Sequence, residues 1–309
     1  MRSRWLAAVL AVGLAGAAPA ASQSLPETVF NDFRYGVSDI LAVWTSPFRG
    51  SARDYATAGV AIGAVGLTAL VDDDIGRWIR DHPEAGVLEV LKPFRERDSK
   101  PKLVDLGAGN SLVQVGGGLY LIGLIAGSQN LRDAGIGCIA AEKSNGIPRH
   151  YIYKGVHRER PLYEVATPTD TTERLGDAYD IEFPGDDEDW FDNSFFGGHG
   201  ANIMACTSFL NHRFDLGYAE PLLWTVAIGV NLGRMADQRH WATDTLIGAT
   251  VGFAIGKYVA ERSLDRAAER NADANGEEGP DEAGPSLLEG VFIDRDAAGR
   301  TLIGWKRSF

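Results

Sequence analysis

Cysteine is almost absent from this chain, because its 309 residues include only Cys138 and Cys206. Neither forms a spacing with histidine that resembles a zinc site, so we predict no metal centre of that kind. Both cysteines lie in apolar, helix-like sequence, which favours two buried thiols that pack as small hydrophobic groups. The alternative is a disulfide between them, which requires a closeness that the sequence does not give.

Basic residues are also in short supply. The chain has 30 Lys and Arg against 42 Asp and Glu, which gives a formal net charge of −12. This balance argues against a nucleic-acid partner and against general attraction to anionic membranes. An anionic substrate would therefore need a locally basic pocket.

Long hydrophobic runs are scarce. Several segments just reach the length of about 17 residues that a membrane span needs, and the mean hydropathy is −0.12. Their small residues suit close helix packing in lipid, but equally in a soluble bundle. The composition favours a largely soluble secreted bundle, with membrane association left open and an integral membrane protein as the alternative.

The N-terminus has the pattern of a secretory signal. Arg2 and Arg4 precede an apolar stretch at residues 5–16, and an Ala-Pro-Ala cleavage site follows at residues 18–20. The alternative is an uncleaved N-terminal anchor. We therefore predict an exported protein that is periplasmic or associated with the cell envelope.

The remaining sequence predicts an all-α fold, a helical bundle of five to six core helices rich in Gly and Ala. The predicted helical segments are residues 55–71, 110–127, 130–153, 200–214, 221–234 and 245–260. The predicted parts are a signal peptide (1–21), an N-terminal helical region (22–108), a helical core (109–262), a disordered acidic linker (263–286) and a short tail that could form a hairpin (287–309).

Two acidic features could suggest cation binding. Three aspartates at residues 72–74 close an apolar run, and we expect a solvated helix cap there rather than a cation site. Residues 162–190 are dominated by acidic side chains and predict an inserted surface loop, able to cover a site as a lid. Calcium binding by this loop is an alternative, but its spacing is not that of a known calcium loop.

The strongest pattern lies in residues 233–244, where His240 and Asp244 form a His-x-x-x-Asp pair. In a helix these positions share a face, so Asp244 could bind one ring nitrogen of His240 and leave the other free to act. Taken alone, such a pair is more often a contact on a helix surface. Arg234 lies just upstream and offers a planar, permanently charged group suited to phosphate.

Two further stretches complete the pattern. Residues 154–161 form a basic cluster that contains Lys154 and ends in Arg160 and a proline, and Gly197, Gly198 and His199 form a turn that opens a helix. Arginines and backbone N–H groups at a helix start can bind phosphoryl oxygens and carry the charge of a transition state, so we predict no metal and no cofactor. Each stretch alone could be structural, as a helix terminus or a plain turn.

In this order the three stretches resemble the signature of the type 2 phosphatidic acid phosphatase / vanadium haloperoxidase superfamily, which is Lys…Arg-Pro, Pro-Ser-Gly-His and Ser-Arg-x-x-x-x-x-His-x-x-x-Asp. The third motif matches best, as Arg234, five residues, His240, three residues and Asp244, with Gly233 in place of the leading serine. The resemblance covers roughly residues 110–260. It implies a compact helical bundle with its site at helix ends.

The resemblance also implies a role for each residue. His240 would attack phosphorus and form a phosphohistidine, and Asp244 would orient it. His199 would protonate the leaving group and then activate water. Arg160 and Arg234 would hold the phosphate.

Two departures weaken the phosphate-binding part of the pattern. Gly197 stands where the second motif has serine, so a hydroxyl donor is missing and the Gly197 amide would have to serve. The lysine of the first motif falls at Tyr153, with Lys154 one place closer to the arginine. One residue is about 100° around a helix, so Lys154 would reach the site only if the helix ends or shifts there; otherwise Arg158 would substitute.

The sequence thus predicts a metal-independent, acid-phosphatase-type phosphomonoesterase acting on a lipid phosphate or another phosphate ester. One alternative is a vanadate-dependent haloperoxidase, since vanadate can occupy the same pocket. Another is a non-catalytic phosphate-binding or envelope-structural protein with an eroded site.

Overall fold

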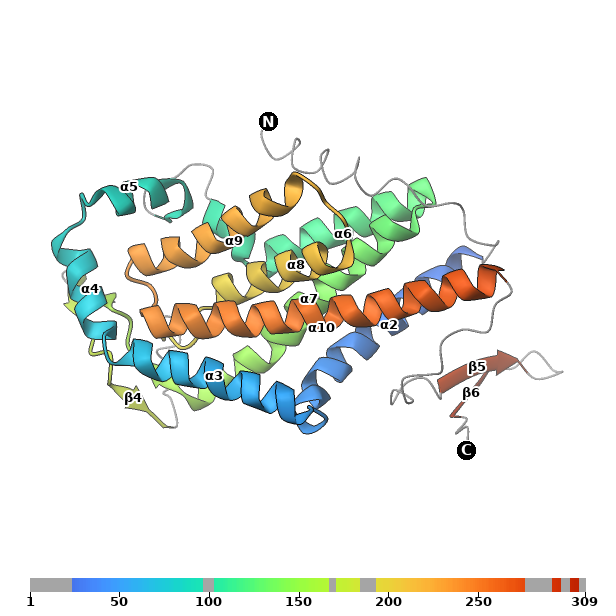
Figure 1. The fold of residues 1–309 in the computed structure, drawn as a ribbon, viewed down its shortest axis with the longest axis horizontal. Helices are drawn as coiled ribbons and strands as arrows, with labels where there is room; N and C mark the ends of the chain where they lie inside the picture. Colours follow the sequence, from blue (N-terminus) through green and yellow to red (C-terminus); the bar gives the residue numbers. More distant parts are fainter. Residues whose placement is uncertain are drawn as a thin grey trace.

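The chain folds into a bundle of long helices, which confirms the predicted all-α class (Figure 1). The computed structural model describes residues 24–96, 103–166, 171–183, 193–275, 291–295 and 301–305. The α-helices are α2 (Leu25–Thr45), α3 (Ala52–Ala69), α4 (Asp72–Asp81), α5 (Gly86–Leu91), α6 (Gly109–Ala126), α7 (Gln129–Gly155), α8 (Gly198–Arg213), α9 (Ala219–Ala236) and α10 (Ala242–Asn275). The 3₁₀ helices are η1 (Ser46–Phe48), η2 (Lys92–Phe94) and η3 (Leu103–Gly107).

Within the described residues, the strands form three short antiparallel pairs. They are β1 (His157–Arg158) with β4 (Ile181–Glu182), β2 (Leu162–Ala166) with β3 (Thr171–Leu175), and β5 (Val291–Arg295) with β6 (Thr301–Trp305). Several predictions lie outside the described residues: the signal peptide, the acidic cluster at residues 186–189 and the linker at residues 276–286.

Helix α8 lies at the centre of the bundle, where α7, α9 and α10 pack against it (Figure 1). Its residues are buried along most of its length, as expected for a helix with small and apolar side chains on all sides. A Cβ at Gly252 or Gly256 of α10 would lie 2.2 or 2.1 Å from a backbone carbonyl oxygen of α8. These glycines let the two helices approach closely, and the core thereby fixes the first turn of α8, which carries His199.

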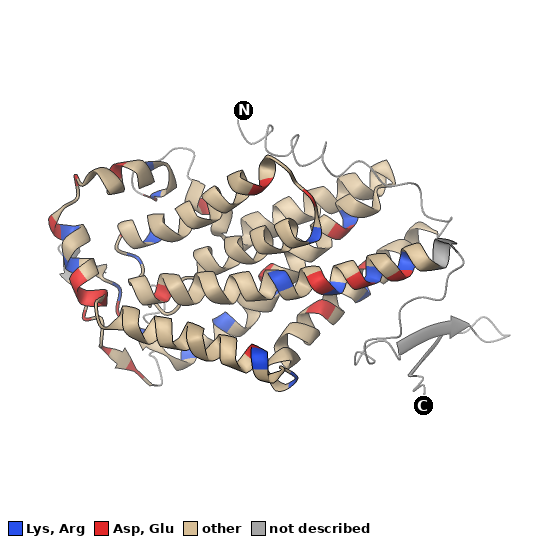
Figure 2. Cartoon of the chain, viewed as in Figure 1, with Lys and Arg blue, Asp and Glu red and all other residues tan. Residues whose placement is uncertain are grey.

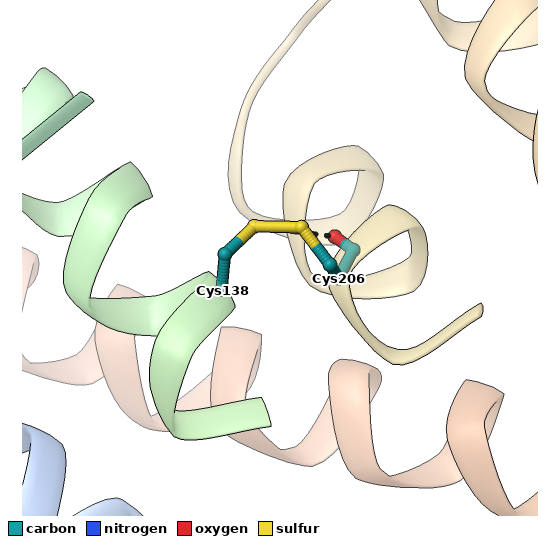
Figure 3. Close-up of a disulfide and its surroundings, with 2 residues drawn as sticks. All are labelled: Cys138 and Cys206. Carbon is teal, nitrogen blue, oxygen red and sulfur yellow. Dashed lines mark hydrogen bonds between the residues drawn. A yellow bond between two sulfur atoms is a disulfide. The ribbon is translucent and has the colours of Figure 1, made fainter. Parts of the chain in front are cut away.

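A disulfide joins α7 to α8, which corrects the prediction of two free thiols (Figure 3). The sulfur atoms of Cys138 and Cys206 are 2.03 Å apart, and their Cα atoms are 4.6 Å apart. Both residues belong to the main hydrophobic core. The pairing could not be predicted because the sequence separation is 68 residues, and helix packing alone brings the two together.

Loss of this disulfide should destabilise the fold. A closed loop with a separation of 68 residues is expected to contribute about 4 kcal/mol through the entropy of the unfolded chain. We expect Cys138→Ala/Cys206→Ala to lower the free energy of unfolding by about 2–4 kcal/mol in denaturant titrations. Wild type titrated in the presence of a reductant should match the double variant; equal midpoints for oxidised wild type and the variant would contradict the prediction.

Helix α10 is longer than predicted. The sequence predicts a disordered linker from residue 263, whereas α10 continues well into that segment. Arg266 donates to Asp39 of α2 at 2.7 Å, and Arg270 donates to Asp133 of α7 at 2.7 Å. The composition of the segment alone indicates disorder. The carboxylates that hold it in place, Asp39 and Asp133, lie far away in the sequence and leave no local signal.

Helix α3 presents an apolar surface to solvent. Charged residues occur only in its first turn (Figure 2), and Val60, Ile62 and Leu67 are each at least 70% exposed. Within the described residues, a single helix, α6, has the length and the apolar composition needed to cross a membrane. Helices α3 and α4, which are bent by 51° relative to each other, would form a second candidate if the pair were one broken span. Exposed apolar surface of this kind marks a place of contact with lipid or protein.

Candidate active site

The three motif stretches meet at the end of the bundle where α9 ends and α10 begins (Figure 1). The chain after α7 runs beside the chain before α8, where Ser194 N donates to Arg158 O at 2.8 Å. The turn between α9 and α10 joins them, because Trp241 Nε1 donates to Glu159 O at 2.7 Å. Segments that lie far apart in the sequence therefore share one site.

A left-handed residue ends α9 and directs the chain into this site. Gln238 has a φ of 59°, and its N–H donates to Met235 O at 2.9 Å. The N–H of Arg239 donates to Arg234 O at 3.0 Å. This pair of hydrogen bonds is the Schellman pattern of helix ends, and it places Arg234 in the last turn of α9 with His240 directly beyond it.

His240 lies in the turn between two helices, so the predicted helical pair with Asp244 is wrong. Its Nδ1 is 2.8 Å from the backbone carbonyl oxygen of Ser194. A carbonyl only accepts, so Nδ1 carries the proton and Nε2 keeps its lone pair. The imidazole is only 3% exposed. The main chain of Ser194 therefore fixes the tautomer that the sequence assigned to Asp244.

Asp244 supports the site through a buried ion pair instead. Its carboxylate accepts Trp241 N at 3.1 Å and Arg158 Nη1 at 2.8 Å. Burial raises the pKa of Asp244 to about 6, although Arg158 acts in the opposite direction, so the carboxylate is ionised at neutral pH. Asp244 thus closes the first turn of α10 and positions the adjoining His240 without contacting its ring nitrogens.

The first aspartate of the triplet at residues 72–74 is fully buried, which corrects the prediction of a solvated cap. Asp72 accepts hydrogen bonds from Thr243 N at 2.9 Å and from Arg158 Nη2 at 2.8 Å. Arg158 is therefore held between two carboxylates and does not substitute for the lysine of the first motif. Asp73, which follows Asp72 in the triplet, is partly exposed and pairs with Arg77.

The two histidines lie within the electrostatic field of the same cations. Burial and the charges of Arg234, Arg149 and Arg160 lower the pKa of His199 to about 4. Burial, Arg234, Arg160 and His199 also lower the pKa of His240. Both imidazoles are therefore neutral at neutral pH, and an anion bound beside them would raise the pKa of His199 again.

Arg234 is 7% exposed, and its Nη1 donates to the Glu96 carboxylate at 2.8 Å. Glu96 follows η2, which packs against α9 so closely that a Cβ at Gly233 would lie 2.4 Å from Phe94 O. No side chain fits at position 233, which explains why the serine of the motif is absent. The Glu96 carboxylate stands in for an anionic oxygen on Arg234, so a phosphate would compete with it for this arginine.

Gly197 does not offer its amide to a ligand as predicted. Its N–H donates to Asp244 O at 3.1 Å, and its carbonyl accepts Ala201 N at 2.9 Å as the cap of α8. The N–H groups from Gly198 onward have no acceptor within an α-helix, and they form the positive end of the helix dipole. The expected anion donors therefore shift along the chain to Gly198 and His199.

Lys154 is exposed near the end of α7, and it is not among the charges that lower the pKa of either histidine. A cation one turn earlier in the helix takes a more favourable position. The guanidinium carbon of Arg149 lies 4.8 Å from the centre of the Tyr153 ring, and its charge acts on His199. Tyr153 is where the motif places its lysine.

Sequence analysis missed four contributors, which are Asp72, Ser194, Glu96 and Arg149. Only Arg149 left a signal, because it precedes the lysine position by one helical turn. Within the described residues, no group of three or more His, Cys, Asp or Glu side chains is placed to hold a metal ion.

Comparisons with known proteins identify a matching family and a partial relative. Residues 147–266 match the family described as the PAP2 superfamily. A lipid A 1-phosphatase of Porphyromonas gingivalis is 37% identical over 71 residues, which cover 21% of this chain and 15% of that protein. The chain thus matches only a small part of that relative. No solved structure matches the chain.

Proposed function

Because residues 147–266 belong to the PAP2 superfamily, we propose that this protein is a metal-independent phosphomonoesterase that acts on a lipid phosphate through a phosphohistidine. The observation that carries the proposal is the geometry of His240. Its Nδ1–H is held by Ser194 O at 2.8 Å, which leaves Nε2 as a nucleophile in a cluster with His199, Arg160 and Arg234.

The proposed reaction has two steps. His240 Nε2 attacks phosphorus while the bond from phosphorus to the ester oxygen breaks, and protonated His199 gives its proton to the departing alcohol. Neutral His199 then takes a proton from water, whose oxygen attacks phosphorus while the phosphorus–nitrogen bond breaks. Inorganic phosphate leaves, and both histidines return to their starting states.

Charge stabilisation comes from the chain itself. Arg160 and Arg234 supply guanidinium groups, which bind phosphoryl oxygens through charge-assisted hydrogen bonds. The first turn of α8 adds N–H groups and the positive end of its dipole. Fixed donors of this kind are worth most where a site excludes water, and His240 and Arg234 are both buried.

Three observations favour a lipid substrate and an envelope location. The partial relative is named a lipid A 1-phosphatase. The exposed apolar face of α3 leads directly into α4, whose Asp72 lies beneath the site. The disulfide between α7 and α8 is the kind of bond that persists in an oxidising compartment outside the cytoplasm.

The proposal is tested with the purified full chain in mild detergent. We expect inorganic phosphate to be released from phosphatidic acid or from a lipid A phosphate, with activity unchanged by EDTA and blocked by orthovanadate. Activity that disappears with EDTA and returns with a divalent metal would contradict a metal-independent mechanism. Halide oxidation on addition of vanadate, without phosphate release, would favour a haloperoxidase.

The role of His199 predicts a dependence on the leaving group. His199→Ala should reduce kcat for an alkyl or lipid phosphate by about 100-fold or more, because general acid catalysis is lost. The leaving group of p-nitrophenyl phosphate needs little protonation. The rate of phosphoryl transfer from this substrate to His240, measured before breakdown of the phosphoenzyme becomes limiting, should therefore fall much less. Equal losses on both substrates in single-turnover experiments would exclude His199 as the acid.

The pH profile checks the same assignment. Because the pKa of His199 is lowered to about 4 in the free protein, the acid form is lost as the pH rises through that value, and kcat/KM should decline above it. A bound phosphate raises this pKa, so kcat should decline at higher pH than kcat/KM. His199→Ala should remove this limb from both profiles.

A further inference from the structure

Arg149 is a partly buried arginine that has no counter-ion among the described residues. Its Nε is buried with no hydrogen-bond partner, and it takes part in no ion pair within the described chain. Several other buried or partly buried arginines of the bundle are paired, for example Arg132 with Asp32 at 3.0 Å and Arg213 with Asp133 at 3.0 Å. A cation that is shielded from water and has no anionic partner is energetically unfavourable. Binding of an anionic ligand beside Arg149 would therefore be favourable.

The guanidinium of Arg149 lies against the start of α8. A Cβ at Gly198 would be 2.2 Å from its Nη1 and 2.4 Å from its Cζ, so only glycine leaves room for the arginine. This contact places the guanidinium beside the first N–H groups of the helix and in range of His199, whose pKa it helps to lower. The cation therefore points to the same anion position as the helix terminus.

Tyr153 supports Arg149 from the other side. Its ring centre is 4.8 Å from the guanidinium carbon, a distance at which a cation is attracted to an aromatic face. Tyr153 is also close enough to Arg234 to act on the pKa of that arginine. The position at which the first motif has lysine thus lies beside the site, but it holds an aromatic platform in place of a charge.

We propose that Arg149 is the third cation of the phosphate site, binding a non-bridging oxygen of the substrate in place of the lysine of the motif, with Tyr153 as its platform. This inference rests on the proposed phosphatase function. A planar guanidinium can donate two parallel hydrogen bonds to a phosphate, which an ammonium group cannot. The guanidinium also supplies a hydrogen-bond donor to the site, in which Gly197 has no hydroxyl where the motif has serine.

The test compares variants of the full chain in detergent. Arg149→Met keeps the apolar stem, removes the charge and should lower kcat/KM for phosphatidic acid by about 10- to 100-fold. Lys257→Met removes an exposed charge on α10 and should leave activity unchanged. Arg149→Met/Tyr153→Lys restores a cation at the lysine position and should recover most of the loss. No recovery, with both proteins folded, would contradict a role for Arg149 as a phosphate ligand.

Binding of orthovanadate, measured by calorimetry, separates the two proposals. If wild type binds orthovanadate but hydrolyses no phosphate ester, the proposed function fails, and weaker binding by Arg149→Met still supports the phosphate ligand. If wild type is active and Arg149→Met matches it in kcat/KM and in orthovanadate affinity, the inference about Arg149 is wrong while the phosphatase stands. A larger loss for Lys154→Met than for Arg149→Met would also overturn it.

A second variant guards against misfolding of Arg149→Met. Gly198→Ala leaves Arg149 in the chain but adds a Cβ where its guanidinium lies, so it should weaken orthovanadate binding as well. In the background of Arg149→Met the added methyl group should cost much less, because the two changes act on one contact. Additive effects of the two substitutions would contradict the proposed contact.

Discussion

Replacement of His240 by alanine is expected to abolish phosphate release, with a loss in kcat of at least about 1000-fold, as removal of a nucleophile requires. The imidazole is buried, and its Nδ1–H is held by the Ser194 carbonyl. Initial rates on phosphatidic acid in detergent, compared with wild type at equal protein concentration, provide the measurement.

Two controls make this result specific to the nucleophile. His82 lies on the surface at the end of α4, and His82→Ala should keep full activity. His240→Ala should still bind orthovanadate, although more weakly, because Arg160 and Arg234 remain in place. Activity of His240→Ala within a few-fold of wild type would exclude His240 as the nucleophile.

The second large effect is expected at Asp72, which lies outside every motif. Asp72 is fully buried and accepts hydrogen bonds from Arg158 and Thr243. Removal of one partner from a buried ion pair costs about 3–5 kcal/mol, because the remaining charge stays buried. Asp72→Ala should therefore lower the free energy of unfolding by about that amount and should reduce activity, since the first turn of α10 positions His240.

The adjacent aspartate is a matched control for Asp72. Asp73→Ala removes a partly exposed ion pair with Arg77, and such pairs contribute at most about 1 kcal/mol. Denaturant unfolding and kcat/KM should both stay close to wild type. Equal destabilisation by the two substitutions would contradict the proposal that the network of Asp72, Arg158 and Asp244 stabilises the fold.

The sequence pointed to the candidate reacting groups because their spacing is local. Arg234, His240 and Asp244 lie within eleven positions of one another, and the convergence of the other two stretches followed from the resemblance. The role of Asp244 was wrong for a physical reason. A helical i,i+4 pair was assumed, but the Schellman turn at Gln238 ends α9 before His240, and α10 starts after it.

The remaining parts of the site depend on contacts between distant segments. Asp72 meets Thr243 across 171 positions, and Glu96 meets Arg234 across 138. Composition alone describes an aspartate triplet as a solvated cap, because no local feature marks the one side chain that turns inward. The disulfide between Cys138 and Cys206 and the extension of α10 escaped prediction for the same reason.

Close packing, which a sequence does not reveal, explains two glycines beside the candidate phosphate site. Gly233 replaces serine because the Phe94 carbonyl oxygen occupies the space of a side chain. Gly198 leaves room for Arg149 in the same way. The departure from the motif at Gly233 thus has a steric cause in this fold, and it does not require that the site has lost its function.

The phosphohistidine itself is tested most directly by trapping. Wild-type protein would be mixed with phosphatidic acid, quenched in alkali, in which phosphohistidine survives, and digested for mass spectrometry. We expect a peptide containing His240 to carry the mass of one phosphoryl group. The His199→Ala protein should accumulate more of it when the substrate is p-nitrophenyl phosphate, because this leaving group needs little protonation while water attack is slowed. Turnover by wild type with no phosphoryl group on His240, or with the group on another residue, would contradict the proposed mechanism.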